Sequence, residues 1–153
     1  MNATWMPCSG LESFDDMVWL PRLVQKARRY ATSDGAAMNG YLYGDNDFID
    51  RRVLDFLRID DAQLGRLVRE LEGDDAVARA VIERSGRSPD ERRAYSRKLR
   101  RQLFDFVLLE ADEGRLPPGF KRSVIRFLYN RVMMPPINAA FRRAERKRSL
   151  RET

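Results

Sequence analysis

The sequence predicts an all-α fold, a single domain of five or six helices followed by a basic helical tail at the C-terminal end. Apolar residues recur at helical spacing along most of the 153 residues, and no segment shows the alternation that is typical of strands. Proline, glycine and acidic residues recur at positions that favour helix starts and stops. We expect a mobile leader over residues 1–16, the helical domain over 17–136 and the tail over 137–153.

The first predicted helix begins near Pro21, because proline is accommodated in the first turn of a helix and disrupts later turns. Its apolar residues Leu23, Ala27 and Tyr30 follow helical spacing. Residues 33–47 contain three glycines and an Asp-Asn-Asp run, which together predict a loop.

Three short helices are expected after this loop. The first carries Val53, Leu54 and Leu57 on its apolar side. Asp60 and Asp61 cap the second, whose apolar residues are Leu64, Leu67, Val68 and Leu71. Gly73 ends the second helix, and Asp74 or Asp75 opens the third, with its apolar residues Val77, Val81 and Ile82 turned inward.

Ser88 gives the clearest helix start in the chain. It combines a capping hydroxyl with Pro89 at the first helical position, acids in the first turn and Glu91 three residues after the cap. The helix is expected to run to about Glu113. A sixth helix is expected over 120–134, and a basic amphipathic segment is expected from Asn138 onward.

The charge of the chain is unevenly divided between its two parts. Residues 119–153 hold ten Lys and Arg against two Glu, a net charge of +8, whereas the whole chain carries +6. Concentrated positive charge indicates a polyanionic partner. The stretches predicted to be exposed and basic are 84–101 and 138–153. The side chains predicted to contact a polyanion are Arg92, Arg93, Arg97, Lys98, Arg101, Arg142, Arg143, Arg146, Lys147 and Arg148.

The composition disfavours several classes of function. The chain has no histidine and one cysteine, Cys8, so Ser-His or Cys-His nucleophiles, internal disulfides and thiolate metal clusters are excluded. Asp45, Asp47 and Asp50 are close in sequence, yet the run lacks the glycine and distal glutamate of a calcium loop. We therefore predict no catalytic residues, no metal and no cofactor. The sequence shows no signal peptide or membrane span, which predicts a cytoplasmic protein and disfavours a membrane-surface role.

One candidate anion site involves the first helix. Arg22, Lys26 and Arg29 share one helix face, and after folding they are expected near Tyr41, Tyr43 and Asp50. Cations would attract the anion, phenols would donate hydrogen bonds and Asp50 would orient a guanidinium. The alternative, which we favour, is a solvated basic face with Asp50 capping the next helix.

Short sequence words along the chain resemble one known family. They are Trp19-Leu20-Pro21-Arg22, Lys26-Ala27-Arg28, Tyr41-Leu42-Tyr43-Gly44, Ile49-Asp50 and Leu54-Asp55-Phe56-Leu57. In this order they resemble a family of small bacterial helical proteins catalogued as a domain of unknown function. The resemblance covers about residues 16–101 and implies a helical fold without implying an activity. Members tend to have glycine after the Phe-Leu pair, where this chain has Arg58, so a tight helix exit is not expected there.

We favour a non-catalytic interaction or regulatory module that binds a protein partner, whose identity the sequence does not give. One version uses residues 120–141 as a docking helix or homodimer face; the alternative is that this helix covers the Ser88 helix within one monomer. A second hypothesis is sequence-tolerant binding of RNA or DNA through the two basic stretches. An enzyme that binds a small anion is the least favoured class.

Overall fold

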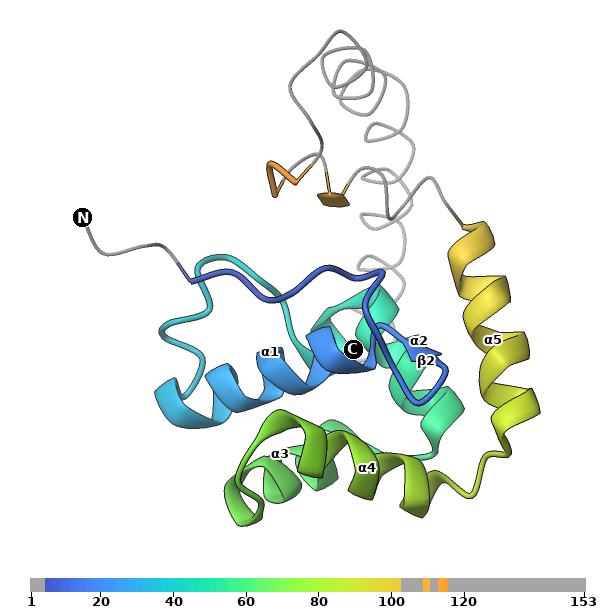
Figure 1. Ribbon diagram of the computed structural model, residues 1–153. Coiled ribbons are helices and arrows are strands. Elements are labelled where there is room, and N and C mark those ends of the chain that lie inside the picture. Colours follow the sequence, from blue (N-terminus) through green and yellow to red (C-terminus); the bar gives the residue numbers. More distant parts are fainter. Residues whose placement is uncertain (1–4, 103–108, 111–112, 116–153) are drawn as a thin grey trace, which may run out of the picture. The chain divides into compact units, whose positions relative to one another are not determined.

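The computed structural model describes residues 5–102, 109–110 and 113–115. The chain forms two compact units, Met1–Phe106 and Val107–Thr153. All the helices and strands named below belong to the first unit (Figure 1). Within the part of the chain that the structure describes, no helix is both long and apolar enough to cross a membrane.

The described residues form five α-helices, one short 3-10 helix and one two-stranded hairpin, so the predicted helical class is confirmed. In chain order the elements are β1 (Ser13–Phe14), β2 (Met17–Val18), α1 (Leu20–Ser33), the 3-10 helix η1 (Gly44–Asn46), α2 (Phe48–Leu57), α3 (Asp61–Glu70), α4 (Asp74–Ser85) and α5 (Pro89–Arg101). The predicted sixth helix and basic tail lie outside the described residues, as does the domain limit expected at residue 136.

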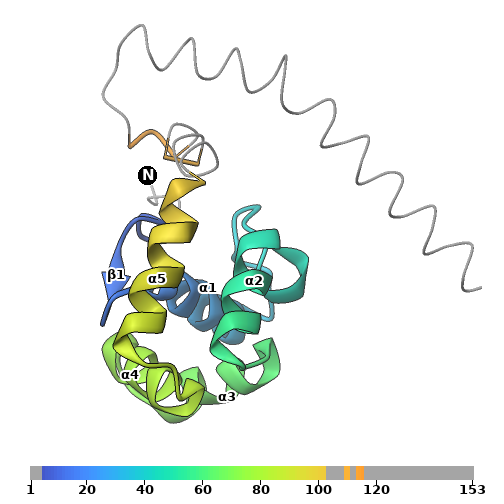
Figure 2. The ribbon, with the colours of Figure 1, turned by 90° about the vertical axis from the view of Figure 1, so that its right-hand side faces the viewer.

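Helix α1 is the centre of the apolar core. Its residues Leu20, Leu23 and Val24 are fully buried, and the helix packs against α3 and α4. The facing side chains are those predicted from the periodicity, among them Leu64 of α3 and Val77 of α4, which are also fully buried. Figures 1 and 2 show α3 and α4 below α1, with α5 beside the hairpin.

The hairpin is an element that the sequence did not predict. Ser13 pairs with Val18 and Phe14 with Met17, around a two-residue turn at Asp15 and Asp16. Both turn residues have positive φ, 45° and 64°, as the favoured hairpin turns require. Strands of two residues are too short to show an alternating pattern. The described part of the leader thus contacts the helical domain, and its predicted mobility stays a prediction.

Several helix starts were predicted correctly. Asp60 and Gln63 form a capping box before α3, and Ser88 and Glu91 form one before α5. Helix α2 differs from the prediction, because its cap is Asp47. The Asp47 carboxylate accepts hydrogen bonds from the backbone N–H groups of Ile49 and Asp50 in the first turn of α2. The proposal that Asp50 caps this helix was wrong.

Helix α5 ends earlier than predicted. The expected limit was about Glu113, but the helix ends at Arg101, and Gln102 leaves helical geometry at φ −76° and ψ 41°. The Arg52 Nη1 atom donates a hydrogen bond of 2.7 Å to the Gln102 side-chain oxygen. Three cations in the last turn suit the negative end of the helix dipole. The apolar periodicity therefore did not mark the end of the helix.

Arg58 ends α2 in a left-handed conformation, with φ 55° and ψ 38°. Its N–H donates to the carbonyl groups of Asp55 and Leu54, which closes the helix tightly. The sequence did not predict this exit, because glycine is the usual residue in that conformation. An arginine here adopts a backbone shape that its Cβ disfavours.

We expect Arg58→Gly to raise the free energy of unfolding by about 0.5–1 kcal/mol, because glycine removes the Cβ strain of the left-handed conformation. Urea denaturation followed by far-UV circular dichroism measures the change. Arg58→Ala is the control, since it removes the same side chain and keeps the strain. Equal stabilities of the two variants would contradict the strain argument.

The capping box of α5 predicts a specific pH dependence. The Ser88 backbone N–H donates a hydrogen bond of 2.8 Å to Glu91, which lowers the pKa of Glu91 below its ordinary value of 4.5; a hydrogen bond from the Arg87 guanidinium adds to this effect. A carboxyl whose pKa is lower in the folded state stabilises the fold above its unfolded pKa, and this stabilisation is lost as the pH falls through the folded value.

The wild type should therefore exceed Glu91→Gln in stability at pH 7, and the difference should shrink as the pH falls below about 4.5. Glutamine keeps an oxygen that accepts from Ser88 and does not titrate. Urea denaturation of both proteins between pH 7 and pH 3 measures the difference. A gap that stays constant over this range would show that ionisation of Glu91 does not contribute.

Candidate functional site

A lysine is buried at the junction of α1, α2 and the loop that precedes α2. The Lys26 Nζ atom lies 2.6 Å from a carboxylate oxygen of Asp50 and 2.8 Å from one of Asp47. The side chain of Lys26 is 1% exposed, and that of Asp50 is fully buried. An ammonium in the interior needs such carboxylate partners, because the desolvation of a lone charge is very unfavourable.

The remaining hydrogen bonds of Asp50 come from Trp19 and Gly44. The Trp19 indole N–H donates to one carboxylate oxygen at 2.8 Å, and the Gly44 backbone N–H donates to the other at 3.2 Å. Burial raises the pKa of Asp50 and outweighs the opposing effect of Lys26. Trp19 itself has positive φ, 74°, an unusual conformation for a bulky side chain. Sequence reasoning missed Trp19 and Asp47 as members of this cluster.

The two arginines predicted to line the anion site are held by internal contacts. The Arg22 side chain is buried, its Nη1 atom donates to the Cys8 carbonyl oxygen at 2.8 Å, and its guanidinium lies over the rings of Trp19 and Tyr41. Arg29 faces a different group of residues, since its Nε atom donates to the Ala37 carbonyl oxygen and its guanidinium lies over the Trp5 ring.

The structure therefore places only some of the predicted anion-site residues together. Arg22, Lys26 and Asp50 are gathered around the Trp19 ring, whereas Arg29 and Tyr43 lie in other contacts. The favoured alternative of a solvated basic face was wrong for Arg22 and Lys26, which are both 1% exposed. Anion binding at these residues stays a prediction, and the structure shows their charges engaged by protein groups.

The predicted polyanion surface of α5 divides into two sets. Arg92 is buried and donates to the Asp15 carboxylate at 2.6 Å, and Arg93 pairs with Asp16 at 2.8 Å and with Asp90 at 2.7 Å. These two arginines attach the turn of the hairpin to α5. The other cations face outward.

We call Arg97, Lys98 and Arg101 the α5 basic row. All three are exposed, and none of their side chains has a hydrogen bond or ion pair with another described residue. The remaining predicted contacts, in the tail, lie outside the described residues: Arg142, Arg143, Arg146, Lys147 and Arg148.

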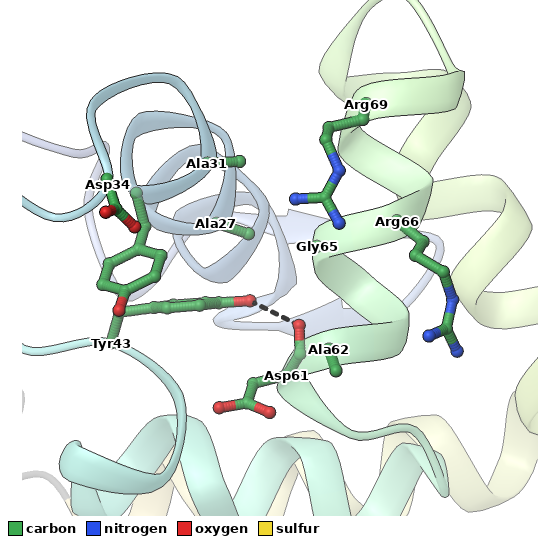
Figure 3. Close-up of a pocket in the computed structure, with 10 residues that line it drawn as sticks. Ala27, Ala31, Asp34, Tyr43, Asp61, Ala62, Gly65, Arg66 and Arg69 are labelled. Carbon is green, nitrogen blue, oxygen red and sulfur yellow. Dashed lines mark hydrogen bonds between the residues drawn. The ribbon is translucent and has the colours of Figure 1, made fainter.

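A pocket of about 420 Å³ lies between α1 and α3 (Figure 3). We call it the α1–α3 pocket. Small side chains from both helices line it, namely Ala27, Ala31, Ala62 and Gly65.

Tyr43, predicted at the anion site, lines this pocket instead, and its hydroxyl donates to the Asp61 carbonyl oxygen at 3.2 Å. Burial raises the pKa of Tyr43 far above its usual range, so the phenol stays neutral. Sequence patterns gave no signal for this pocket.

We expect Lys26→Met to lower the free energy of unfolding by about 3–5 kcal/mol, because it leaves the buried carboxylate of Asp50 without its cation. The double variant Lys26→Met/Asp50→Asn should recover at least about 1 kcal/mol of this loss, since an amide oxygen still accepts from Trp19. Urea denaturation measures all three proteins. Arg79→Met, at an exposed arginine of α4, is the control and should change stability by less than about 0.5 kcal/mol. A Lys26→Met protein as stable as this control would refute the role of the pair.

Comparison with known families and proteins gives one positive result. The family model described as Domain of unknown function (DUF5069) matches residues 4–113, which is well over half of the chain and includes every element named above. No curated protein matches the sequence, and no solved structure matches it. The matched range contains all the sequence words that resemble a family of this kind, so that prediction is confirmed. The chain belongs to the DUF5069 family of domains of unknown function.

Proposed function

We propose that the protein is a non-catalytic interaction module whose α5 basic row binds an acidic segment of a partner protein. The observation that carries this proposal is the outward position of three neighbouring cations, Arg97, Lys98 and Arg101, with no acidic partner among the described residues. Their neighbours Arg92 and Arg93 differ, because each is paired within the fold.

The row stands on a firmly packed helix. Tyr95 stacks on Phe56 with ring centroids 3.9 Å apart, and its hydroxyl donates to the Arg52 carbonyl oxygen at 2.8 Å. Leu99, between the cations in sequence, is buried. Residues 97 and 101 lie one helical turn apart, roughly 6 Å along the axis, and 98 lies beside them. A partner carboxylate therefore meets cations whose backbone is already fixed, which reduces the entropy lost on binding.

The charges near the row favour a protein partner over nucleic acid. A row of roughly 6 Å spans only about two phosphates of one DNA strand. Contacts with so few phosphates contribute little binding affinity. The first turn of the same helix carries Asp90 and Glu91, which would repel a phosphate chain that followed the helix.

The connection between α3 and α4 also disfavours a role in reading DNA. It has the three-residue length and the glycine, Gly73, of a helix-turn-helix motif. However, the second helix begins with Asp74 and Asp75, at the end that would approach the groove and its phosphates. Sequence-tolerant binding of RNA or DNA through residues 84–101 and 138–153 is the alternative, and the test below includes it.

We also propose a cytoplasmic location, which suits a chain with one cysteine.

We expect the triple variant Arg97→Glu, Lys98→Glu and Arg101→Glu to bind its protein partner at least tenfold more weakly, a loss of about 1.4 kcal/mol. The full-length chain is used to capture proteins from a lysate of the source organism, with and without nuclease treatment of the lysate. Mass spectrometry quantifies the captured partner. The affinity of the identified partner is then measured at several salt concentrations, and it should fall as salt rises.

The matched control is the triple variant Arg51→Glu, Arg79→Glu and Arg84→Glu, which changes the same charge at exposed positions on α2 and α4. It should retain the captured proteins. If both triple variants lose them equally, net charge rather than the row controls binding. If nuclease alone abolishes capture, the nucleic-acid alternative replaces the proposal.

A further inference from the structure

We propose that the α1–α3 pocket binds a small aromatic anion, a ligand with a planar ring and one phosphate or carboxylate group. The pocket is separate from the α5 basic row, so this inference does not depend on the proposed partner. Its volume of about 420 Å³ lies in the range that small organic ligands occupy in proteins.

Gly65 opens the floor of the pocket. Glycine in the middle of a helix lowers helix stability relative to alanine, so its presence in α3 needs a reason. Its backbone does not require glycine, since its φ is ordinary for a helix. A Cβ at this position would meet only the guanidinium nitrogens of Arg69, at 3.7 Å and 3.9 Å, which is ordinary contact. Neither the backbone nor the described neighbours therefore explain the glycine, whereas a ligand on this floor does.

Two tyrosines form the aromatic wall. The Tyr30 and Tyr43 rings lie 5.2 Å apart with their planes tilted by 37°. The hydrogen bond from Tyr43 to the Asp61 carbonyl oxygen holds one ring in place, while Tyr30 is 44% exposed, which is high for a large aromatic side chain. An exposed ring against a fixed ring offers a stacking surface for a planar ligand.

Arg69 supplies the positive charge. Figure 3 shows the Arg69 side chain extending from α3 toward α1; Arg66, which also lines the pocket, extends in another direction. The Arg69 side chain is exposed and has no hydrogen bond or ion pair with another residue that the structure describes. A guanidinium recognises phosphate and carboxylate groups through paired donors.

Two carboxylates fix the direction in which the ligand lies. Asp34 and Asp61 also line the pocket, and Figure 3 shows both on the tyrosine side, apart from Arg69. They repel the anionic group from that side and accept hydrogen bonds from amino groups on the ring. The geometry thus orients the ligand with its ring over the tyrosines and its anionic group at Arg69. Adenosine monophosphate and 4-aminobenzoate both carry an amino-substituted ring and an anion, and they serve as probes.

The test measures the binding of both probes to the full-length chain by isothermal titration calorimetry, with adenosine, aniline and inorganic phosphate as partial ligands. We expect at least one probe to bind with Kd below about 1 mM and at least tenfold more tightly than each of its own fragments. Arg69→Gln should weaken this probe at least tenfold. Arg79→Gln, the control at an exposed arginine of α4 that does not line the pocket, should weaken it less than twofold.

A second variant, Gly65→Leu, fills the floor and should abolish binding in a protein whose circular dichroism is unchanged. The arginine pair tests the proposal even if this variant fails to fold. Binding of neither probe would overturn the proposal. Equal losses in Arg79→Gln and Arg69→Gln would also overturn it, because they would indicate attraction to the general surface charge. If inorganic phosphate binds as tightly as adenosine monophosphate, the tyrosine wall does not contribute to binding of the nucleotide.

Discussion

The buried ammonium of Lys26 constrains the arrangement of the elements around it. Its position between Asp47 and Asp50 requires α1, the loop before α2 and the first turn of α2 to meet at one place. Buried ion pairs contribute little net stability relative to apolar contacts, but a misplaced partner leaves an unpaired charge in the interior. The pair therefore favours a single register between these elements. Asp50 extends the constraint to Trp19 and Gly44, which stand at the start of α1 and of η1.

Arginines connect the ends of the other helices, which gives the arginine-rich composition a structural role. Arg28 donates to the Val68 and Leu71 carbonyl oxygens at the end of α3 and to the Asp74 carboxylate at the start of α4. Arg87 donates in the same way to Phe56 near the end of α2. Helix ends leave carbonyl groups without helical partners, and a guanidinium can serve several of them. Much of the positive charge is therefore used inside the fold, and only part of it is available for binding.

Local signals predicted the helices well, because caps and apolar spacing act within a few residues. The Ser88 capping box and the buried face of α3 both follow from nearby sequence. Contacts across the fold were not predictable in this way. The burial of Lys26 depends on carboxylates that follow a long loop, and the α1–α3 pocket depends on the distance between two helices. The sequence predicted that Arg92 contacts a polyanion together with the α5 basic row, because nothing in the sequence shows that Arg92 pairs with the hairpin.

The contact between the hairpin and α5 joins the first and last elements of the described domain. Asp15 and Arg92 are separated by 77 positions, and the Val18 amide donates to Ser96, 78 positions further along. The loop closed by this contact contains α1 through α4, so its closure costs more entropy than contact between neighbouring helices. During synthesis the Val18 amide and both turn carboxylates cannot reach these partners until α5 itself has been made. The hairpin turn, although it precedes α1 in the chain, therefore gains its α5 partners only after every helix between them has been made.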